Sequence, residues 1–363
     1  MYFSEIKLKD FRNYRDQTIE FHPKINIISG KNAQGKTNIL EGLYIMSLGK
    51  SFRTNKDSEM IRFGEDFGSA KTVYIKDKSE RNLEVVISKY GKSLIIDGYK
   101  AKKNSEFVDN VYIVAFTPED MKIVKDEPEK RRRYIDREIC QIRPVYYRNL
   151  MSYKKALVQR NALLKQENTD SNLMDIWERK LAGYGTKIII ERIEFMNKVN
   201  EISSEIHREI TEGNEKLELF YETSISGEPK DIEKIFIEKL IENRKRDLLR
   251  GSTGVGPHRD DIKIIIDDID VRNYGSQGQQ RTAALSLKLA EIKIIKNDKN
   301  ESPVLLLDDV LSELDEKRQE YLLKSLSNVQ LFITTAEKKA SLFREFVDWA
   351  LFEVNDGKCV RTS

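Results

Sequence analysis

Residues 30–37, GKNAQGKT, have the residue types and the spacing of a loop that binds phosphate groups. The segment fits G-x-x-x-x-G-K-[ST] at every specified position, with Gly30, Gly35, Lys36 and Thr37. Glycines let the backbone curl so that successive N–H groups point at phosphate oxygens. The lysine reaches the outer phosphates, and the threonine hydroxyl can ligate Mg²⁺. We therefore expect a nucleotide to bind along Gly30, Lys31, Asn32, Ala33, Gln34, Gly35, Lys36 and Thr37.

A second chemical signal is a pair of acids at the end of an apolar run, PVLLLDD, residues 303–309. A buried parallel strand places the residues at its carboxyl end in the crevice where a phosphate loop lies. There Asp308 could hold Mg²⁺ together with Thr37. Asp309 could be the catalytic carboxylate that orients or deprotonates an attacking water. The alternative is that both are exposed turn acids.

A third segment, YGSQGQQR at residues 274–281, resembles an incomplete anion-binding turn because it lacks a lysine. Ser276 could simply cap the helix that follows. That reading does not explain Gly278 and Gln279, since glycine in a first helical turn is costly. A serine hydroxyl, a glycine N–H and a helix N-terminus together could hold the γ-phosphate of a nucleotide bound elsewhere.

The elements that must position these residues follow from hydrophobic periodicity. The run INIIS at residues 25–29 predicts a strand before the phosphate loop, and NILEGLYIMSLG at residues 38–49 predicts a helix after it. From about residue 121 the apolar spacing becomes helical, and from about residue 213 strands and helices alternate. We expect an α/β head split in sequence, residues 1–120 and 213–363, with a helical arm inserted at residues 121–212.

Composition excludes little. The chain has 363 residues, a formal net charge of +3 and two cysteines without metal-ligand spacing. No apolar run approaches the roughly 20 residues of a membrane span, and the amino terminus lacks a secretory apolar region. We expect a cytoplasmic protein with two ordinary thiols.

The motif set resembles the heads of ABC-type ATPases: a phosphate loop, Ser-x-Gly-Gln, and an apolar strand that ends in two acids. The details resemble the RecF proteins of bacterial recombinational repair, in FRNY (11–14), SLGKSFRT (47–54), FTPEDM (116–121), EKRRRYID (129–136) and GPHRDD (256–261). The resemblance implies ATP with Mg²⁺ and slow hydrolysis. It also implies an ATP-dependent homodimer in which the loop at Ser276, Gly278 and Gln279 completes the partner's nucleotide site.

The same resemblance implies binding to single-stranded or gapped DNA, with RecO and RecR as partners in loading a recombinase. Two departures from the wider ABC pattern suggest slow turnover. Asp309 stands where most heads use glutamate, and Thr334 and Thr335 stand where a γ-phosphate-sensing histidine usually follows. A nucleotide-gated scaffold with negligible turnover stays open as an alternative, and so does the ATPase subunit of a membrane transporter.

Candidate DNA contacts come from local charge. Residues 122–160 hold twelve Lys or Arg and five Asp or Glu, which points to Arg131, Arg132 and Arg133, with Arg53 as the next candidate. Tyr134, Tyr146, Tyr147 and Tyr153 lie among these cations and could stack on bases, or they could be core residues. His258 has no His or Cys neighbours in the sequence, so we expect a hydrogen-bonded turn and no metal there.

Overall fold

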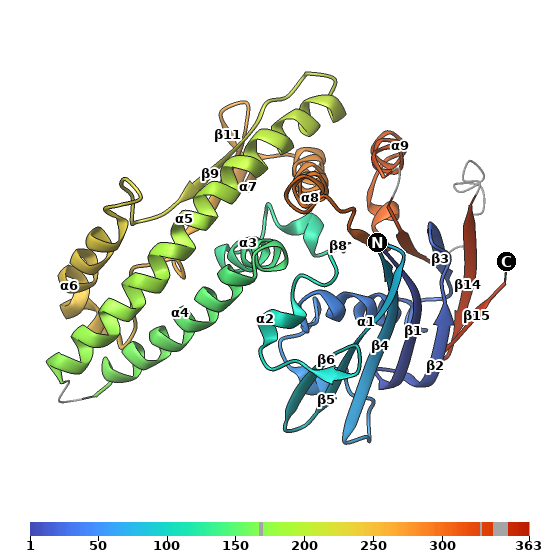
Figure 1. Ribbon diagram of the computed structural model, residues 1–363. Helices are drawn as coiled ribbons and strands as arrows, with labels where there is room; N and C mark the ends of the chain where they lie inside the picture. The colour runs from blue at the N-terminus through green and yellow to red at the C-terminus, as the bar shows by residue number, and fades with distance from the viewer. Residues whose placement is uncertain (167–169, 327–328, 337–347, 363) are drawn as a thin grey trace. The chain divides into compact units, whose positions relative to one another are not determined.

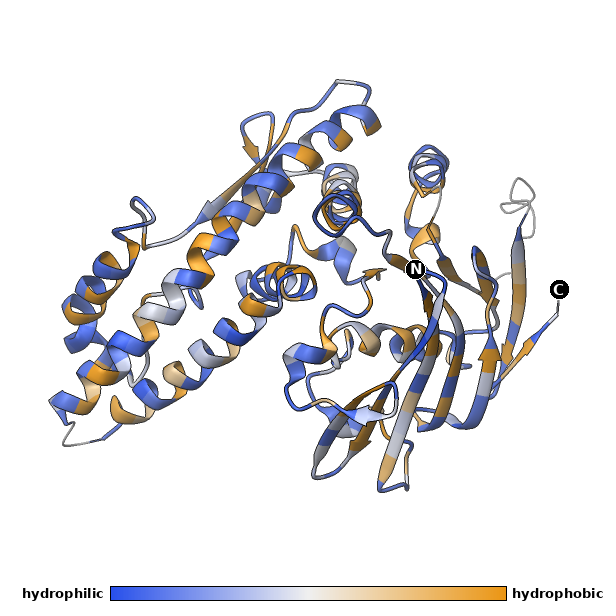
Figure 2. Cartoon of the chain, viewed as in Figure 1, coloured by the Kyte–Doolittle hydropathy of each residue, from blue (hydrophilic) through white to orange (hydrophobic). Residues whose placement is uncertain are grey.

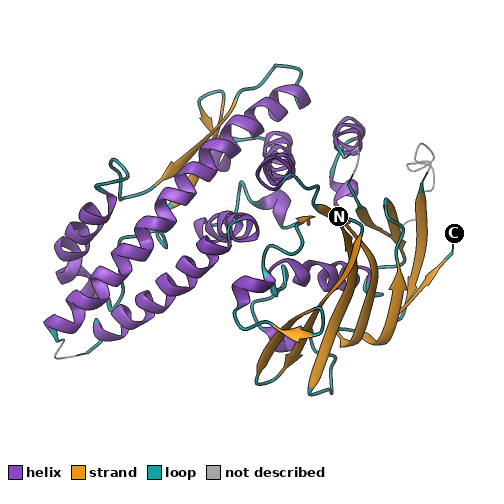
Figure 3. Ribbon diagram, in the orientation of Figure 1, coloured by secondary structure: helices purple, strands orange, loops and turns teal. Residues whose placement is uncertain are grey.

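The computed structural model describes residues 1–166, 170–326, 329–336 and 348–362. The chain forms two compact units, one of residues 1–122 with 288–363 and one of residues 123–287 (Figure 1). Strands dominate the first unit and helices the second (Figure 3). The mixed α/β architecture expected from the sequence is confirmed. The functional division of the chain at residues 120 and 212 stays a prediction.

A six-stranded, mostly parallel sheet in the first unit carries the chemistry. Its order is β15-β14-β3-β13-β12-β8, and β15 alone pairs antiparallel. The strands are β3 (Ile25–Ser29), β8 (Ile113–Phe116), β12 (Val304–Asp308), β13 (Leu331–Thr335), β14 (Trp349–Asn355) and β15 (Lys358–Arg361). Continuous apolar runs suit such strands, because both faces of a parallel sheet are covered.

The other sheet of this unit is antiparallel, in the order β2-β1-β4-β5-β6-β7. Its strands are β1 (Tyr2–Phe11), β2 (Tyr14–Glu20), β4 (Phe67–Lys76), β5 (Ser79–Ser88), β6 (Gly91–Ile96) and β7 (Tyr99–Lys100). Helix α1 (Lys36–Leu48) shares one apolar core with strands of both sheets, and eleven of its thirteen residues are buried. Most of the buried residues of α1 are apolar, and its buried polar residues include Lys36 and Glu41. The remaining helices are α2 (Asn104–Phe107) and α9 (Glu316–Ser325), with short 3₁₀ turns at Asp57–Met60, Asp120–Lys122 and Val310–Glu313.

The second unit is built on long helices, α3 (Pro128–Ile142), α4 (Pro144–Leu163), α5 (Ser171–Ile210) and α6 (Ile232–Arg250). Apolar and polar residues recur along α4 and α5, which pack against each other (Figure 2). A small antiparallel sheet, β11-β10-β9, completes the unit, with β9 (Leu217–Glu222), β10 (Asp261–Ile266) and β11 (Ile269–Asp270). The sequence predicts β9 and β10 as strands of a mostly parallel sheet; their antiparallel pairing corrects that expectation. Helix α7 (Val271–Tyr274) follows, and the division between the two units falls within α8 (Gln277–Lys299), after Leu287.

Candidate functional site

The phosphate loop joins the end of β3 to the start of α1. Gly35, at the N-cap of α1, has φ +117°, and a Cβ there would lie within 3 Å of Asn13 and Tyr14 side-chain atoms. Glycine is therefore required at this position. Asn13 Nδ2 donates to Gln34 O at 2.9 Å and Tyr14 Oη to Gly35 O at 3.1 Å. The FRNY turn thus fastens the second half of the loop.

Lys36 lies within the curve of the loop. The residue is 4% exposed, and its Nζ donates to the carbonyl oxygens of Gly30 at 2.7 Å and Lys31 at 3.1 Å. Lys31, Asn32 and Ala33 form the exposed crest. The Gln34 side chain accepts a hydrogen bond from Asp356 N at 2.7 Å, so it braces the loop against the β14–β15 turn.

The acid pair lies close to Thr37 because β12, which ends in Asp308, is separated from β3 by only one strand, β13. Asp308, the last residue of β12, accepts hydrogen bonds at Oδ1 from Thr37 Oγ1 and Thr334 Oγ1, both at 2.8 Å. Thr334 Oγ1 in turn accepts from Asp309 N at 3.0 Å. A threonine hydroxyl beside a carboxylate is a donor set that fits Mg²⁺, which takes oxygen ligands and keeps waters and substrate phosphates in its shell. The prediction that brings Thr37 and Asp308 together is thus supported by the geometry, while their roles stay predictions.

The fold controls the ionisation of Asp308. Burial raises the pKa of this carboxyl above its usual value, and the charge of Asp309 raises it further. Hydrogen bonds from Thr37 and Thr334 and the positive charge of Arg53 lower the pKa again. Asp309 is half-buried and has φ +54°, in the left-handed region that non-glycine residues rarely adopt.

The sequence did not indicate that Thr334 contacts the acid pair. It showed this residue only where other heads have a histidine. In the structure, the Thr334 hydroxyl donates to Asp308 and accepts from the backbone N of Asp309. The available signal was a threonine at the carboxyl end of the strand that pairs with the acid-bearing strand.

Ser276 and Gln279 cap helix α8 reciprocally. Ser276 Oγ accepts from Gln279 N at 3.1 Å, and Gln279 Oε1 accepts from Ser276 N at 3.0 Å. This is a capping box, so the helix-cap interpretation of Ser276 is confirmed. Ser276 is nevertheless exposed, and Gly278 lies in the first turn of α8. Their part in completing a partner's nucleotide site stays a prediction.

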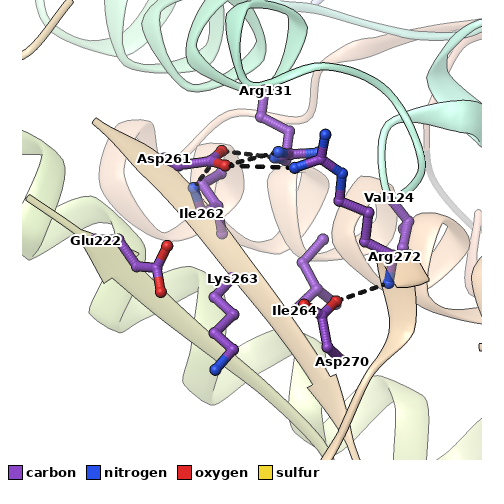
Figure 4. Close-up of a pocket in the computed structure, with 9 residues that line it drawn as sticks. All are labelled: Val124, Arg131, Glu222, Asp261, Ile262, Lys263, Ile264, Asp270 and Arg272. Carbon is purple, nitrogen blue, oxygen red and sulfur yellow. Dashed lines mark hydrogen bonds and ion pairs between the residues drawn. The ribbon is translucent and has the colours of Figure 1, made fainter. Parts of the chain in front are cut away.

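The predicted DNA contact Arg131 requires a correction. It is 1% exposed, and its Nε and Nη2 each donate to the Asp261 carboxylate at 2.7 Å. Figure 4 shows this ion pair in the wall of a cavity of about 100 Å³. The other charged side chains that line the cavity balance in sign: Glu222, Lys263, Asp270 and Arg272. A buried guanidinium that binds a carboxylate in this way is not presented to a DNA phosphate.

The neighbouring arginines differ from Arg131. Arg132 is half-buried and donates to Asp260 O at 2.7 Å. The side chain of Arg133 is 57% exposed and pairs with Glu129 one turn earlier. In the first unit, the side chain of Arg53 is 43% exposed. Arg53 and Arg133 therefore remain the better candidates for DNA contacts, and their role stays a prediction.

The four tyrosines among these cations are core residues. Each is 6% exposed or less: Tyr134, Tyr146, Tyr147 and Tyr153. The interpretation that stacks them on bases is wrong, because none presents a ring face to solvent.

His258 forms the hydrogen-bonded turn that the sequence predicts. Its Nδ1 lies 2.6 Å from Tyr153 Oη and its Nε2 lies 3.0 Å from Thr253 O. Since a carbonyl only accepts, Nε2 carries the proton and Nδ1 accepts from the tyrosine. Burial lowers the pKa of His258 to about 4, so the ring is neutral at pH 7. Across the described ranges, 1–166 through 348–362, no cluster of three or more His, Cys, Asp or Glu could hold a metal ion. No helix within these ranges is long and apolar enough to cross a membrane.

A phosphate loop between β3 and α1, an acid pair at the end of β12 and a capped Ser-x-Gly-Gln helix define the class of ABC-type ATPase heads. The family described as RecF/RecN/SMC N terminal domain matches residues 2–347. An Smc head from Pyrococcus furiosus, 18% identical with a TM-score of 0.56, has the same fold.

Curated relatives narrow the class. The chain is 43% identical to the DNA replication and repair protein RecF of Clostridioides difficile, over 99% of this chain and 98% of that protein. It is 49% identical to RecF of Agathobacter rectalis, over 92% of each. A solved structure of the recombination mediator protein RecF with ATP, from the RecFOR pathway, is 39% identical, with a TM-score of 0.93 over 100% of this chain and 98% of that one. The chain belongs to the RecF family of DNA replication and repair proteins.

Proposed function

We propose that this chain is an ATP-dependent DNA-binding protein of recombinational repair and replication. The observation that carries the proposal is the arrangement of Lys36 inside the phosphate loop with Thr37 bonded to Asp308. A relative of the same fold has been solved with ATP. Lys36 and the loop N–H groups bind the phosphates, and Thr37 and Asp308 hold Mg²⁺, which neutralises phosphate charge when bound.

Hydrolysis in this proposal is slow. Asp309 orients the attacking water and accepts its proton, and Asp308 stays ionised through the hydrogen bonds of Thr37 and Thr334. The left-handed backbone at Asp309 sets the direction of its short carboxylate. Ser276, Gly278 and Gln279 act on the nucleotide of a second copy, so ATP promotes a homodimer.

The DNA partner is single-stranded or gapped DNA, and the protein partners are RecO and RecR in loading a recombinase in the cytoplasm. Support comes from the RecFOR pathway named for the solved relative. Residues 1–120 and 213–363 serve as the head and residues 121–212 as the helical arm. Exposed Arg53 and Arg133 are the DNA contacts best placed to reach a phosphate.

The test measures binding of a fluorescent gapped DNA by anisotropy with ATP, with ADP and without nucleotide. ATP should tighten binding by tenfold or more, which is on the order of 1.4 kcal/mol. Lys36→Met should remove both ATP binding and this enhancement, because the cation for the outer phosphates is lost. Equal DNA affinity in all three nucleotide states would contradict the proposal.

A nucleotide-gated scaffold with negligible turnover is the second candidate, favoured by the short carboxylate at Asp309. Asp309→Asn separates the two functions. If Asp309 is catalytic, this variant binds ATP normally and hydrolyses it more slowly than the wild type. If the wild type hydrolyses ATP as slowly as Asp309→Asn, at a negligible rate, the protein is a nucleotide-gated scaffold.

A further inference from the structure

A buried acid on helix α1 binds two arginines beside the phosphate loop. Glu41 has a side chain that is 0% exposed. Its carboxylate accepts from Arg12 Nε at 2.7 Å and Arg12 Nη2 at 2.6 Å, and Arg53 Nη1 lies 3.5 Å away. Ser51 Oγ also donates to it. A carboxylate this buried is retained only with charged and hydrogen-bonded partners, and here it has both.

The two arginines come from different segments, and each makes a further hydrogen bond. Arg12 lies in the β1–β2 turn with φ +55°, and its Nη1 donates to Glu59 O at 2.6 Å. Arg53 lies after α1, where its backbone N donates to Ser51 Oγ at 2.8 Å. Glu41 therefore joins the FRNY turn, the SFRT segment and α1 at one point.

A directional chain of hydrogen bonds runs from this point to the phosphate loop. Arg53 Nη1 donates to Asn38 Oδ1 at 2.7 Å, and Asn38 Nδ2 donates to Asn13 Oδ1 at 2.8 Å. Asn13 Nδ2 then donates to Gln34 O at 2.9 Å. Each asparagine accepts a hydrogen bond at Oδ1 and donates one from Nδ2, so all the bonds point from Arg53 toward the loop. We expect a displacement of Arg53 to disturb the hydrogen bond at the Gln34 carbonyl.

We propose that Glu41 is a positioning residue for the nucleotide reaction, whose buried carboxylate fixes Arg12 and Arg53 beside the phosphate loop. This inference rests on the proposed ATPase function. Glu41 touches no reacting atom; it acts through the two arginines.

The test compares Glu41→Gln with the wild type for ATP affinity and kcat. We expect kcat to fall by about tenfold or more, because misplaced groups beside the reacting atoms slow the chemical step. The ATP affinity should stay close to that of the wild type, since Lys36 and the loop N–H groups are unchanged.

Two further variants exclude a merely structural effect. Asp97→Asn removes another arginine–carboxylate pair of the same unit, Arg81 Nη2 to Asp97 at 2.8 Å, and should leave kcat and the ATP affinity unchanged. Arg53→Gln should reproduce the lower kcat, and adding it to Glu41→Gln should cost little more, since both remove one arrangement. If Glu41→Gln does not fold, Arg53→Gln carries the test alone.

A wild-type kcat in Glu41→Gln, or in Arg53→Gln where only that variant folds, would overturn the inference. Additive losses in the double variant would overturn it as well. Other results would show that the proposed ATPase function itself is wrong. In that case the wild type would not hydrolyse ATP, or Lys36→Met would bind ATP normally.

Discussion

The ionisation of Asp308 depends on the residues that surround its carboxyl. Burial raises the pKa of its carboxyl, and two threonine hydroxyls oppose that effect. Because a Mg²⁺ ligand must be ionised, activity should be lost as the pH falls through the raised pKa of Asp308. The threonine that matters here is Thr334, since Thr37 has its own part in the phosphate loop.

Thr334→Val should move the acid limb of the ATPase pH profile to higher pH, because the carboxylate loses a hydrogen bond that favours its charged form. The lost hydrogen bonds should also lower the free energy of unfolding by about 1–3 kcal/mol. Thr72→Val is the matched control, since the buried Thr72 hydroxyl has no hydrogen-bond partner among the described residues. An unchanged pH profile in Thr334→Val would show that Thr334 does not act on Asp308.

At the scale of the element, helix α3 carries arginines of opposite character only two positions apart. Arg131 faces inward to Asp261, and Arg133 faces solvent. Helical spacing distinguishes them, because the apolar residues Tyr134 and Ile135 lie three and four positions after Arg131 and mark its face as the buried one. Counting charges along the run ignores this spacing.

Arg131→Gln should lower the free energy of unfolding by about 3 kcal/mol, because it removes the close ion pair of the largely buried Asp261 carboxylate and leaves only Arg272, at 4.0 Å, as a charged partner. Arg133→Gln should change stability by less than about 1 kcal/mol. If Arg133 contacts DNA, its variant should lower the slope of log affinity against log salt by about one. Urea unfolding and salt titrations measure both effects. Equal stability of the two variants would contradict the assignment, and an unchanged slope would exclude Arg133 from the DNA site.

The turn that holds His258 makes the second unit sensitive to acid. The pKa of His258 is lowered from its usual value of 6.5 to about 4, so the unfolded state binds a proton first as the pH falls. Stability from this group is complete above about pH 6.5 and is lost between pH 6.5 and 4. Between pH 7 and pH 5 the loss should be about 2 kcal/mol. His258→Gln should flatten this dependence in urea unfolding; a slope as steep as that of the wild type would place the acid sensitivity elsewhere.

At the scale of the whole molecule, features formed by neighbouring residues were predictable from the sequence, whereas contacts between distant residues were not. The phosphate loop was predictable because its glycines, lysine and threonine lie within eight residues, between a strand and a helix. The hydrogen bond between Thr334 and Asp308 was not predictable, because it depends on the pairing of β13 with β12 in the sheet. The buried tyrosines and Arg131 were obscured for a similar reason, since charge counting along a helix ignores which face is covered.

The phosphate loop and the predicted second anion-binding loop belong to different compact units, with Lys36 in one and Ser276 in the other. In the proposed dimer, Lys36 of one copy and Ser276 of the other act on one nucleotide. Ser276→Arg should therefore keep ATP affinity but lose ATP-induced dimerisation, because a bulky cation replaces the hydroxyl.

The most direct measurement is the ATPase rate of an equimolar mixture of Lys36→Met and Ser276→Arg chains, at a concentration where the wild type is dimeric with ATP. Each variant alone should be inactive, whereas a mixed dimer has one intact composite site. Neither variant should form an ATP-induced homodimer, so the dimers that form are mixed and have one working site of two. The mixture should therefore recover up to about half of the wild-type rate per chain. A mixture as inactive as its components, although mixed dimers form, would contradict the shared site. Full activity of Ser276→Arg alone would contradict it too and leave Ser276 as only a helix cap.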